Sequence, residues 1–166
     1  MKYLSGVSKF LVFLLMLALP AVASAPIITV TPLTPTVVPA GPGACPFDLL
    51  MAPEQGRPNS SKTIMFANSQ IISGAAFVTV TNLSNFKSMN FNGSGPSQLS
   101  FVDNNLTTII GNGPLLLFLD PTKIPPTLFT VSYTTGRVVV QLDSSSNTTS
   151  ITYQGGPAQN VCELLE

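Results

Sequence analysis

The chain has 166 residues, of which only 8% are charged, with seven basic and seven acidic side chains and no histidine. A near-neutral chain has no basic patch for nucleic acid or for an anionic membrane surface. Without an imidazole, a Ser-His-Asp or Cys-His catalytic arrangement and a histidine-ligated metal site are both excluded.

The first 23 residues have the organisation of a secretory signal peptide. Lys2 and Lys9 supply the basic residues, residues 10–19 form an apolar run of the right length, and small residues precede a cleavage site before Ser24. The run is too short to span a bilayer, which needs about 20 residues. We therefore expect residues 1–23 to be removed and the product to be secreted to the extracellular space, without a membrane segment.

Residues 24–44 are rich in proline and threonine. Prolines stand at positions 26, 32, 35, 39 and 42, a density that is incompatible with the interior of a sheet. The segment is therefore expected to be an extended linker, or an arm that covers a sheet edge, in a polyproline-like conformation.

From residue 45 onward the dominant pattern has a period of two, with turn-forming Asn, Gly, Asp and Ser residues between short runs. It predicts one all-β domain over residues 45–166, an antiparallel β-sandwich or jelly roll of about 8–10 short strands. The expected strands cover residues 45–51, 62–67, 75–82, 88–91, 98–102, 106–110, 114–119, 128–133, 137–142 and 150–153.

The last stretch predicts a short C-terminal helical turn, because apolar side chains in residues 161–165 recur at helical spacing. Gly156 is the expected N-cap and Pro157 the expected first helical residue. Glu163 and Glu166 would then lie at the negative end of the helix dipole, where a carboxylate is mildly unfavourable. Such a helix needs contacts with the rest of the domain to hold it.

The two cysteines, Cys45 and Cys162, lie near the two ends of the predicted domain. In an oxidising compartment two cysteines most simply form one disulfide. A loop of about 117 residues makes this crosslink worth roughly 5 kcal/mol in the chain-entropy model. The bridge would fasten the C-terminal turn to the first strand of the domain. Two free or intermolecular thiols are the alternative.

Five N-x-S/T sequons predict N-linked glycosylation in a secreted chain. Each asparagine is expected at the surface, either as a glycan acceptor or as an ordinary polar turn residue. The positions are Asn59, Asn82, Asn92, Asn105 and Asn147.

Acidic residues are the remaining candidates for catalysis, since a glycosidase needs only two carboxylates. Asp103, Asp120 and Asp143 stand in turn sequences, where a carboxylate accepts hydrogen bonds from nearby backbone amides, and we interpret them as turn residues. Ser84 and Lys87 match the S-x-x-K spacing without its companion motifs, which favours coincidence. The sequence thus predicts no catalytic residue, no cofactor and no metal ligand.

Three stretches resemble one family of proteins. They are the start CPFD at Cys45, the middle stretch TVTNLSNFKS, and the strand GRVVVQLD that leads to YQGGPAQNVCELL. Together they are similar to small secreted β-sandwich proteins of uncharacterised function from filamentous fungi and actinomycete bacteria. The resemblance covers residues 45–165. It implies the sandwich and the terminal disulfide and supplies no activity. Many bacterial members have Gly-Lys-Ser where this chain has Phe86-Lys87-Ser88.

These observations predict a secreted, glycosylated, non-catalytic protein with a binding, cell-surface or host-interaction role. An extracellular polysaccharide or a host protein is the expected partner. The chain has no tryptophan, so the aromatic platforms on which sugars commonly stack are scarce. The alternatives are a histidine-free carboxylate enzyme acting on polysaccharide, and a structural cell-wall component held by the Pro/Thr-rich segment.

Overall fold

The computed structural model describes residues 25–166, so the predicted signal peptide lies outside the described residues. The described part is all-β, with antiparallel strand pairing throughout and one short C-terminal helix, which confirms the predicted fold class. No helix within residues 25–166 has the length and apolar character needed to cross a membrane.

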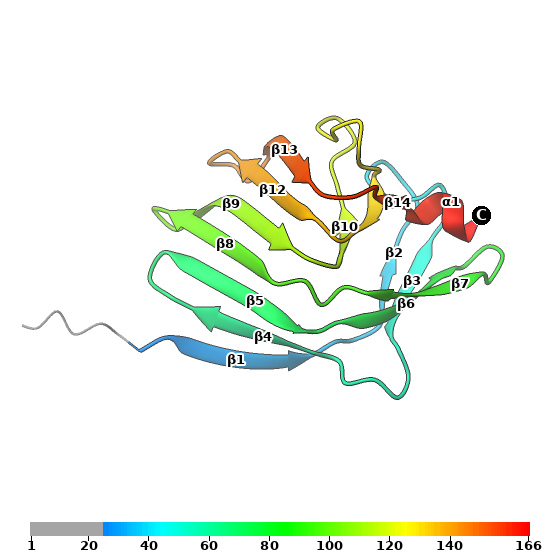
Figure 1. The fold of residues 1–166 in the computed structure, drawn as a ribbon, viewed down its shortest axis with the longest axis horizontal. Helices are drawn as coiled ribbons and strands as arrows, with labels where there is room; N and C mark the ends of the chain where they lie inside the picture. Colours follow the sequence, from blue (N-terminus) through cyan, green and yellow to red (C-terminus); the bar gives the residue numbers. More distant parts are fainter. Residues whose placement is uncertain (1–24) are drawn as a thin grey trace, which may run out of the picture.

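Residues 25–166 form fourteen short strands and one helix (Figure 1). They are β1 (Ile27–Pro32), β2 (Thr36–Val38), β3 (Leu49–Pro53), β4 (Ser60–Met65), β5 (Ser69–Ala75), β6 (Phe77–Asn82), β7 (Ser88–Asn92), β8 (Ser97–Val102), β9 (Asn105–Asn112), β10 (Leu115–Phe118), β11 (Val131–Thr134), β12 (Arg137–Leu142), β13 (Thr148–Gln154), β14 (Gln159–Asn160) and α1 (Val161–Leu165).

The chain crosses the molecule seven times, and each crossing is divided into two strands. One strand of each crossing joins a seven-stranded sheet of order β1-β4-β5-β8-β9-β12-β13. The other strands of the first four crossings form the sheet β2-β3-β6-β7, and those of the last three form the sheet β10-β11-β14. Consecutive crossings are always neighbours, so the topology is an up-and-down meander rather than a jelly roll.

The meander therefore has two unlike halves. We call the seven-stranded sheet the open sheet. We call the two smaller sheets together with α1 the sandwich half. In Figure 1 the hairpin turns of the open sheet lie at one end of the molecule, and α1 lies at the other.

Glycines mark several places where a crossing passes from the open sheet to a smaller sheet. Gly136 separates β11 from β12, and a Cβ there would lie 2.5 Å from the backbone oxygen of Gln154. Gly95 separates β7 from β8, and a Cβ there would collide with the backbone oxygens of Asn112 and Pro114. Only glycine lets the neighbouring crossings approach so closely at the bend.

The main hydrophobic core lies in the sandwich half. It joins the two smaller sheets and α1, which is the packing of a β-sandwich. Its buried members are Cys45, Leu49, Val80, Phe91, Val131, Val161 and Leu165. A second cluster packs β10 and the turn of residues 119–130 against β12 and β13; its buried members are Leu115, Leu119, Leu128, Val138 and Ile151.

The rest of the open sheet has no comparable cover. No residue of β1, β4, β5 or β8 is buried, and all six residues of β1 are exposed. These strands are held by their ladder hydrogen bonds and by half-buried side chains.

The strand count exceeds the prediction because proline-rich and weakly patterned segments also form strands. The Pro/Thr-rich segment supplies β1 and β2, each at the edge of a sheet, where proline is tolerated. It is therefore an edge-covering arm and not a free linker, and the ordered domain begins before Cys45. The prediction also omitted β5, whose sequence SQIISGA lacks alternation, and the two-residue strand β14.

Candidate functional site

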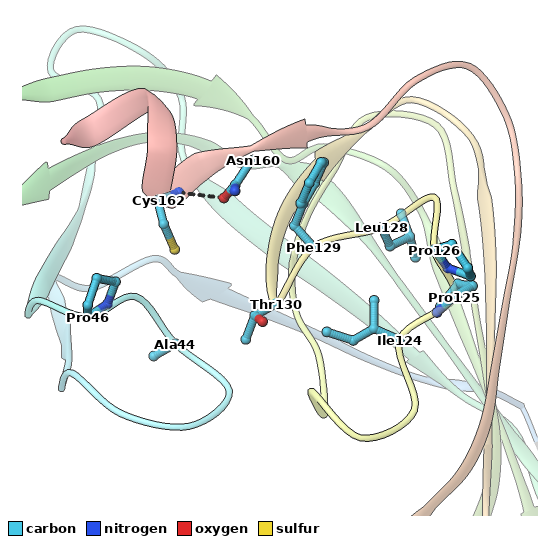
Figure 2. Close-up of a pocket in the computed structure, with 10 residues that line it drawn as sticks. All are labelled: Ala44, Pro46, Ile124, Pro125, Pro126, Leu128, Phe129, Thr130, Asn160 and Cys162. Carbon is cyan, nitrogen blue, oxygen red and sulfur yellow. Dashed lines mark hydrogen bonds between the residues drawn. The ribbon is translucent and has the colours of Figure 1, made fainter.

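A pocket of about 460 Å³ lies beside the disulfide, between two long turns (Figure 2). One wall comes from residues 39–48, which join β2 to β3, and the other from residues 119–130, which join β10 to β11. The start of α1 completes it. The lining residues are Ala44, Pro46, Ile124, Pro125, Pro126, Leu128, Phe129, Thr130, Asn160 and Cys162.

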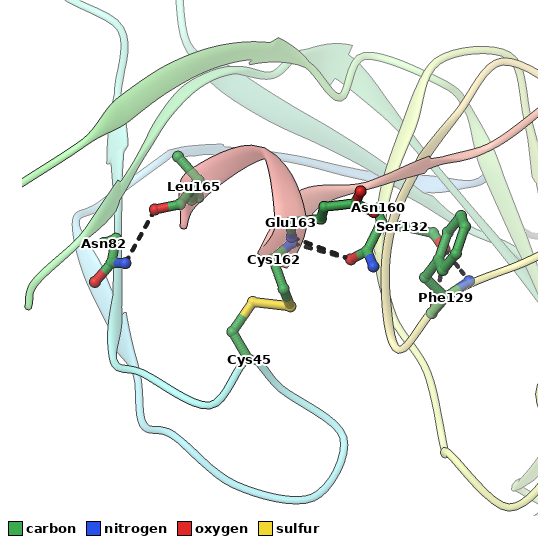
Figure 3. The surroundings of a disulfide bond; sticks show 8 residues. All are labelled: Cys45, Asn82, Phe129, Ser132, Asn160, Cys162, Glu163 and Leu165. Atoms are coloured by element: carbon green, nitrogen blue, oxygen red, sulfur yellow. Dashed lines mark hydrogen bonds between the residues drawn. A yellow bond between two sulfur atoms is a disulfide. The ribbon is translucent and has the colours of Figure 1, made fainter. Parts of the chain in front are cut away.

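The disulfide positions the first wall. Cys45 and Cys162 are bonded with their Cα atoms 5.3 Å apart, as the sequence predicted. Cys45 is fully buried, and its two chain neighbours, Ala44 and Pro46, both line the pocket. Figure 3 shows that the bridge ties this turn directly to the first residues of α1. The pocket shape on this side therefore depends on the crosslink.

The second wall is rigid because its backbone is bonded at several points. The amide of Leu128 donates to the carbonyl of Pro125 at 3.0 Å, and the Leu128 side chain is buried in the second cluster. The hydroxyl of Ser132, fully buried, accepts from the Phe129 amide at 2.7 Å and donates to the Phe129 carbonyl at 2.8 Å. The backbone of Phe129 is thus held at both its amide and its carbonyl, while the residue remains 38% exposed.

Asn160 caps α1 at the third wall. Its Oδ1 accepts from the amides of Cys162 at 3.2 Å and Glu163 at 3.5 Å. The predicted cap at Gly156 and the predicted start at Pro157 were wrong, because glycine has no side-chain oxygen to satisfy these amides. Glu163 consequently lies in the first turn of the helix, where the dipole favours a carboxylate, and not at the negative end.

The far end of α1 is held by the turn between β6 and β7. Asn82 and Asn85 donate from their Nδ2 atoms to the Leu165 carbonyl at 3.0 and 3.1 Å, and Lys87 Nζ donates to the Glu166 carbonyl at 3.4 Å. These bonds provide the external contacts that the predicted helix required.

Asn82 contradicts the expectation that every sequon lies at the surface. Its side chain is only 1% exposed, and Figure 3 shows its amide pointing to the carbonyl of Leu165. Its Oδ1 accepts from both the amide and the hydroxyl of Ser84. The nitrogen that would carry a glycan is enclosed by the fold, so the prediction of a surface acceptor at Asn82 was wrong.

The other four sequons differ in exposure. Asn59 and Asn92 are half-buried, and Asn59 Nδ2 donates to the carbonyl of Glu54. Asn105 and Asn147 are exposed, beside and within the turns at the ends of two open-sheet hairpins. Glycosylation of these four residues stays a prediction.

The turn interpretation of the aspartates is confirmed for two of them. The Thr122 amide donates to Asp120 Oδ1 at 2.9 Å, and the Asn147 amide donates to Asp143 Oδ1 at 2.9 Å. These backbone hydrogen bonds hold the pKa of both carboxyls below the ordinary value of 3.8. Asp103 has a φ of 50° in the turn between β8 and β9.

The remaining polar candidates have other partners. Ser84 bonds to Asn82 and Lys87 reaches the Glu166 carbonyl, so the S-x-x-K spacing does not form a Ser-Lys hydrogen bond. In residues 25–166 no three His, Cys, Asp or Glu side chains gather as a metal site would require.

The pocket is chemically neutral. None of its ten lining residues has a side chain that titrates in the folded protein, since Cys162 is bonded in the disulfide. Apolar side chains dominate, and Thr130 and Asn160 contribute a hydroxyl and an amide. Such a surface suits a ligand with apolar faces and neutral hydrogen-bonding groups, because a charged ligand would lose its hydration without compensation.

The sequence pattern did not reveal this pocket. The alternating pattern predicts a strand over residues 128–133, but β11 begins only at Val131. The three residues before Val131 form part of the pocket wall instead. The Pro125-Pro126 pair is a turn signal that could have moved this boundary.

No family model matches the chain, and the comparisons with known proteins found neither a similar protein nor a similar solved structure. The resemblance to secreted β-sandwich proteins stays a prediction. The function must therefore be argued from the pocket itself.

Proposed function

We propose that the protein is a secreted, non-catalytic binding protein and that the pocket beside the disulfide holds its ligand. The observation that carries the proposal is the partly exposed Phe129, held through its backbone, in the wall of a pocket without ionisable groups. Because the walls are already ordered by Ser132, by prolines and by the disulfide, little conformational entropy is lost on binding.

The ligand class that fits best is a neutral extracellular polysaccharide. A sugar ring has an apolar C–H face that can pack on Phe129 and on the flat ring of Pro46 or Pro126. Its hydroxyls can bond to Thr130 and Asn160. This mixture of apolar contact and a few neutral polar groups is typical of small-ligand sites. A single exposed aromatic ring implies weak binding to each sugar unit.

The disulfide agrees with the predicted secretion, since such bonds persist mainly in oxidising compartments. Asn105 and Asn147 lie beside the turn between β8 and β9 and within the turn between β12 and β13. In Figure 1 these hairpin turns lie at the opposite end of the molecule from α1, whose start borders the pocket. Glycosylation at these two sites is thus compatible with ligand binding.

The test is binding of the secreted protein to insoluble neutral polysaccharides, followed by titration with soluble fragments. Phe129→Ala should weaken binding about tenfold, the value of one aromatic contact of roughly 1.4 kcal/mol. Phe86→Ala is the matched control, because Phe86 is 76% exposed in the turn between β6 and β7 and does not line the pocket.

Equal losses in the two variants, or no binding to any neutral polysaccharide, would reject a polysaccharide site in the pocket. If a host protein instead binds the wild type and does not bind Phe129→Ala, the pocket would remain the binding site and its ligand would be a protein.

A further inference from the structure

One edge of the open sheet carries an unusual share of exposed hydrophobic side chains. In residues 25–166 ten large hydrophobic side chains are exposed, and half of them lie on β1 and at the end of β4. These five are Ile27 at 65%, Ile28 at 56%, Val30 at 63%, Met65 at 46% and Phe66 at 47% exposure. Ile27 and Met65 lie on one face of the sheet and Ile28 and Val30 on the other, so exposed apolar groups line both faces of this edge and mark it as an interaction surface.

The backbone at this edge is also unpaired on one side. β1 is the first strand of the seven-stranded order and pairs only with β4, with Thr29 opposite Thr63. Soluble proteins usually protect such an edge with charged residues, bulges or covering loops. β1 has the sequence IITVTP, without a charge, and its ladder with β4 has no bulge.

The opposite edge of the same sheet is better protected. β13 exposes mainly Thr, Ser and Gln side chains, its ladder with β12 contains a register shift at Gln141/Leu142, and Ile151 is buried in the second cluster. The register shift in particular opposes edge-to-edge pairing. Of the two edges of the open sheet, β1 is therefore the unprotected one.

The sequence of this edge is complementary to itself. Antiparallel pairing of two copies about Thr29 would place Thr29 opposite Thr29, Ile28 opposite Val30, and Ile27 opposite Thr31. Even-numbered residues then pair with even-numbered residues and odd with odd. Side chains on one face of the first copy therefore lie beside side chains on the same face of the second copy. No like charges oppose each other, and β-branched pairs favour the contact.

The flanking prolines select the same register. In a pair centred on Thr29, Pro26 of one copy lies opposite Pro32 of the other at both ends of the ladder. Proline has no amide hydrogen, so the ladder can end there without leaving a donor unpaired. A foreign peptide would need no such symmetry, and this favours a second copy of the chain as the partner.

We propose that β1 is a dimerisation edge, at which two copies pair antiparallel about a two-fold axis at Thr29 and join their open sheets into one. An isologous contact of this kind closes after two copies, and so does not propagate into a fibre. It also gives the apolar row that runs from Ile28 through Ile64 on β4 to Ile71 on β5 a further lateral neighbour, Val30 of the second copy.

The first test measures the mass of the secreted protein by sedimentation and light scattering. Wild type should have twice the monomer mass, and Ile28→Lys/Val30→Lys should be monomeric, because edge lysines prevent strand pairing. Both side chains are exposed, so circular dichroism should show an unchanged fold. Val37→Lys is the control: Val37 is 53% exposed on β2, the edge of a different sheet, and this variant should remain dimeric.

The second test fixes the register. Thr29→Cys should form a covalent dimer under mild oxidation, because opposed Cα atoms in an antiparallel pair lie about 4.5–5.5 Å apart, within the disulfide range. Val30→Cys should crosslink at least tenfold more slowly, since its partner position is Ile28. The native cysteines are paired with each other and do not interfere.

A wild-type protein of monomer mass at every concentration would overturn the proposal, and so would a dimer that persists in the lysine variant. Equal crosslinking of Thr29→Cys and Val30→Cys would refute the symmetric register. None of these outcomes tests the pocket, because its walls come from residues 39–48, residues 119–130 and the start of α1.

Discussion

The sandwich half and the open sheet are built from the same seven crossings of the chain, yet they bury their side chains very differently. In the sandwich half, Leu49, Val80 and Val131 have no exposed surface. In the open sheet, strands β1, β4, β5 and β8 have no buried residue at all. A sheet buries a face only when a second layer covers it, and the second layer exists where the meander divides in two.

The two halves should therefore differ in local stability. The sandwich half contains the main core, the disulfide and the helix, and its long turns form the pocket. The open sheet has long ladders but little cover, which is typical of a region that opens at lower free energy than the core. Four measurements can break or sharpen this contrast.

The largest effect is expected from removing the crosslink of the sandwich half. Cys162→Ser opens a loop of 117 residues, and the chain-entropy model assigns about 5 kcal/mol to its closure. Urea unfolding should show a much lower midpoint, together with a lower yield of folded protein. Cys162→Ser leaves the thiol of Cys45 free. The double variant Cys45→Ser/Cys162→Ser removes this thiol as well and should be equally destabilised. An unchanged urea midpoint in both variants would mean that the disulfide does not contribute to stability.

Matched leucine substitutions compare the two halves directly. Leu49→Ala in β3 leaves a cavity in the main core and should cost about 3 kcal/mol. Leu99→Ala in β8, where the side chain is only half-buried, should cost about 1 kcal/mol. Chemical denaturation of both variants gives the comparison. Similar costs would show that the open sheet is covered in solution.

Buried polar contacts should follow the same division. Asn82→Ala removes a donor to the Leu165 carbonyl in the sandwich half and should cost about 2 kcal/mol. Gln141→Ala on β12 of the open sheet removes an exposed bond from Thr108 and should cost less than about 0.5 kcal/mol. The mass of the purified protein should fall in Asn82→Ala only by the difference between the two side chains; a larger fall, by one glycan, would contradict the buried position.

The smallest effect concerns pH and the turn between β12 and β13. Backbone hydrogen bonds depress the folded-state pKa of Asp143, so its contribution to stability is present above 3.8 and is lost as the pH falls through the folded pKa. The amides of this hairpin should therefore lose protection in acid, when their hydrogen exchange is compared with the intrinsic rate at each pH. Asp143→Asn should flatten that dependence, while exchange in the main core should respond to neither change.

The predictable part of this structure is the part that local pattern controls. Alternating side chains indicated most of the strands, and the two cysteines indicated their own pairing. Asp120 and Asp143 were recognised as turn residues because their hydrogen bonds are made within four residues of the chain. The helix cap at Asn160 was accessible in principle, since a cap is also a local feature.

The sequence by itself determined the all-β class, the disulfide and the turn chemistry, because each depends on near neighbours or on having only one possible partner. Only the tertiary structure decided where the meander divides, which half is covered, that Asn82 is buried and that Phe129 borders a pocket. These depend on register and packing between segments far apart in the chain: Asn82 meets Leu165 across 83 residues. A period of two indicates that a strand has two faces, but not what lies against either one.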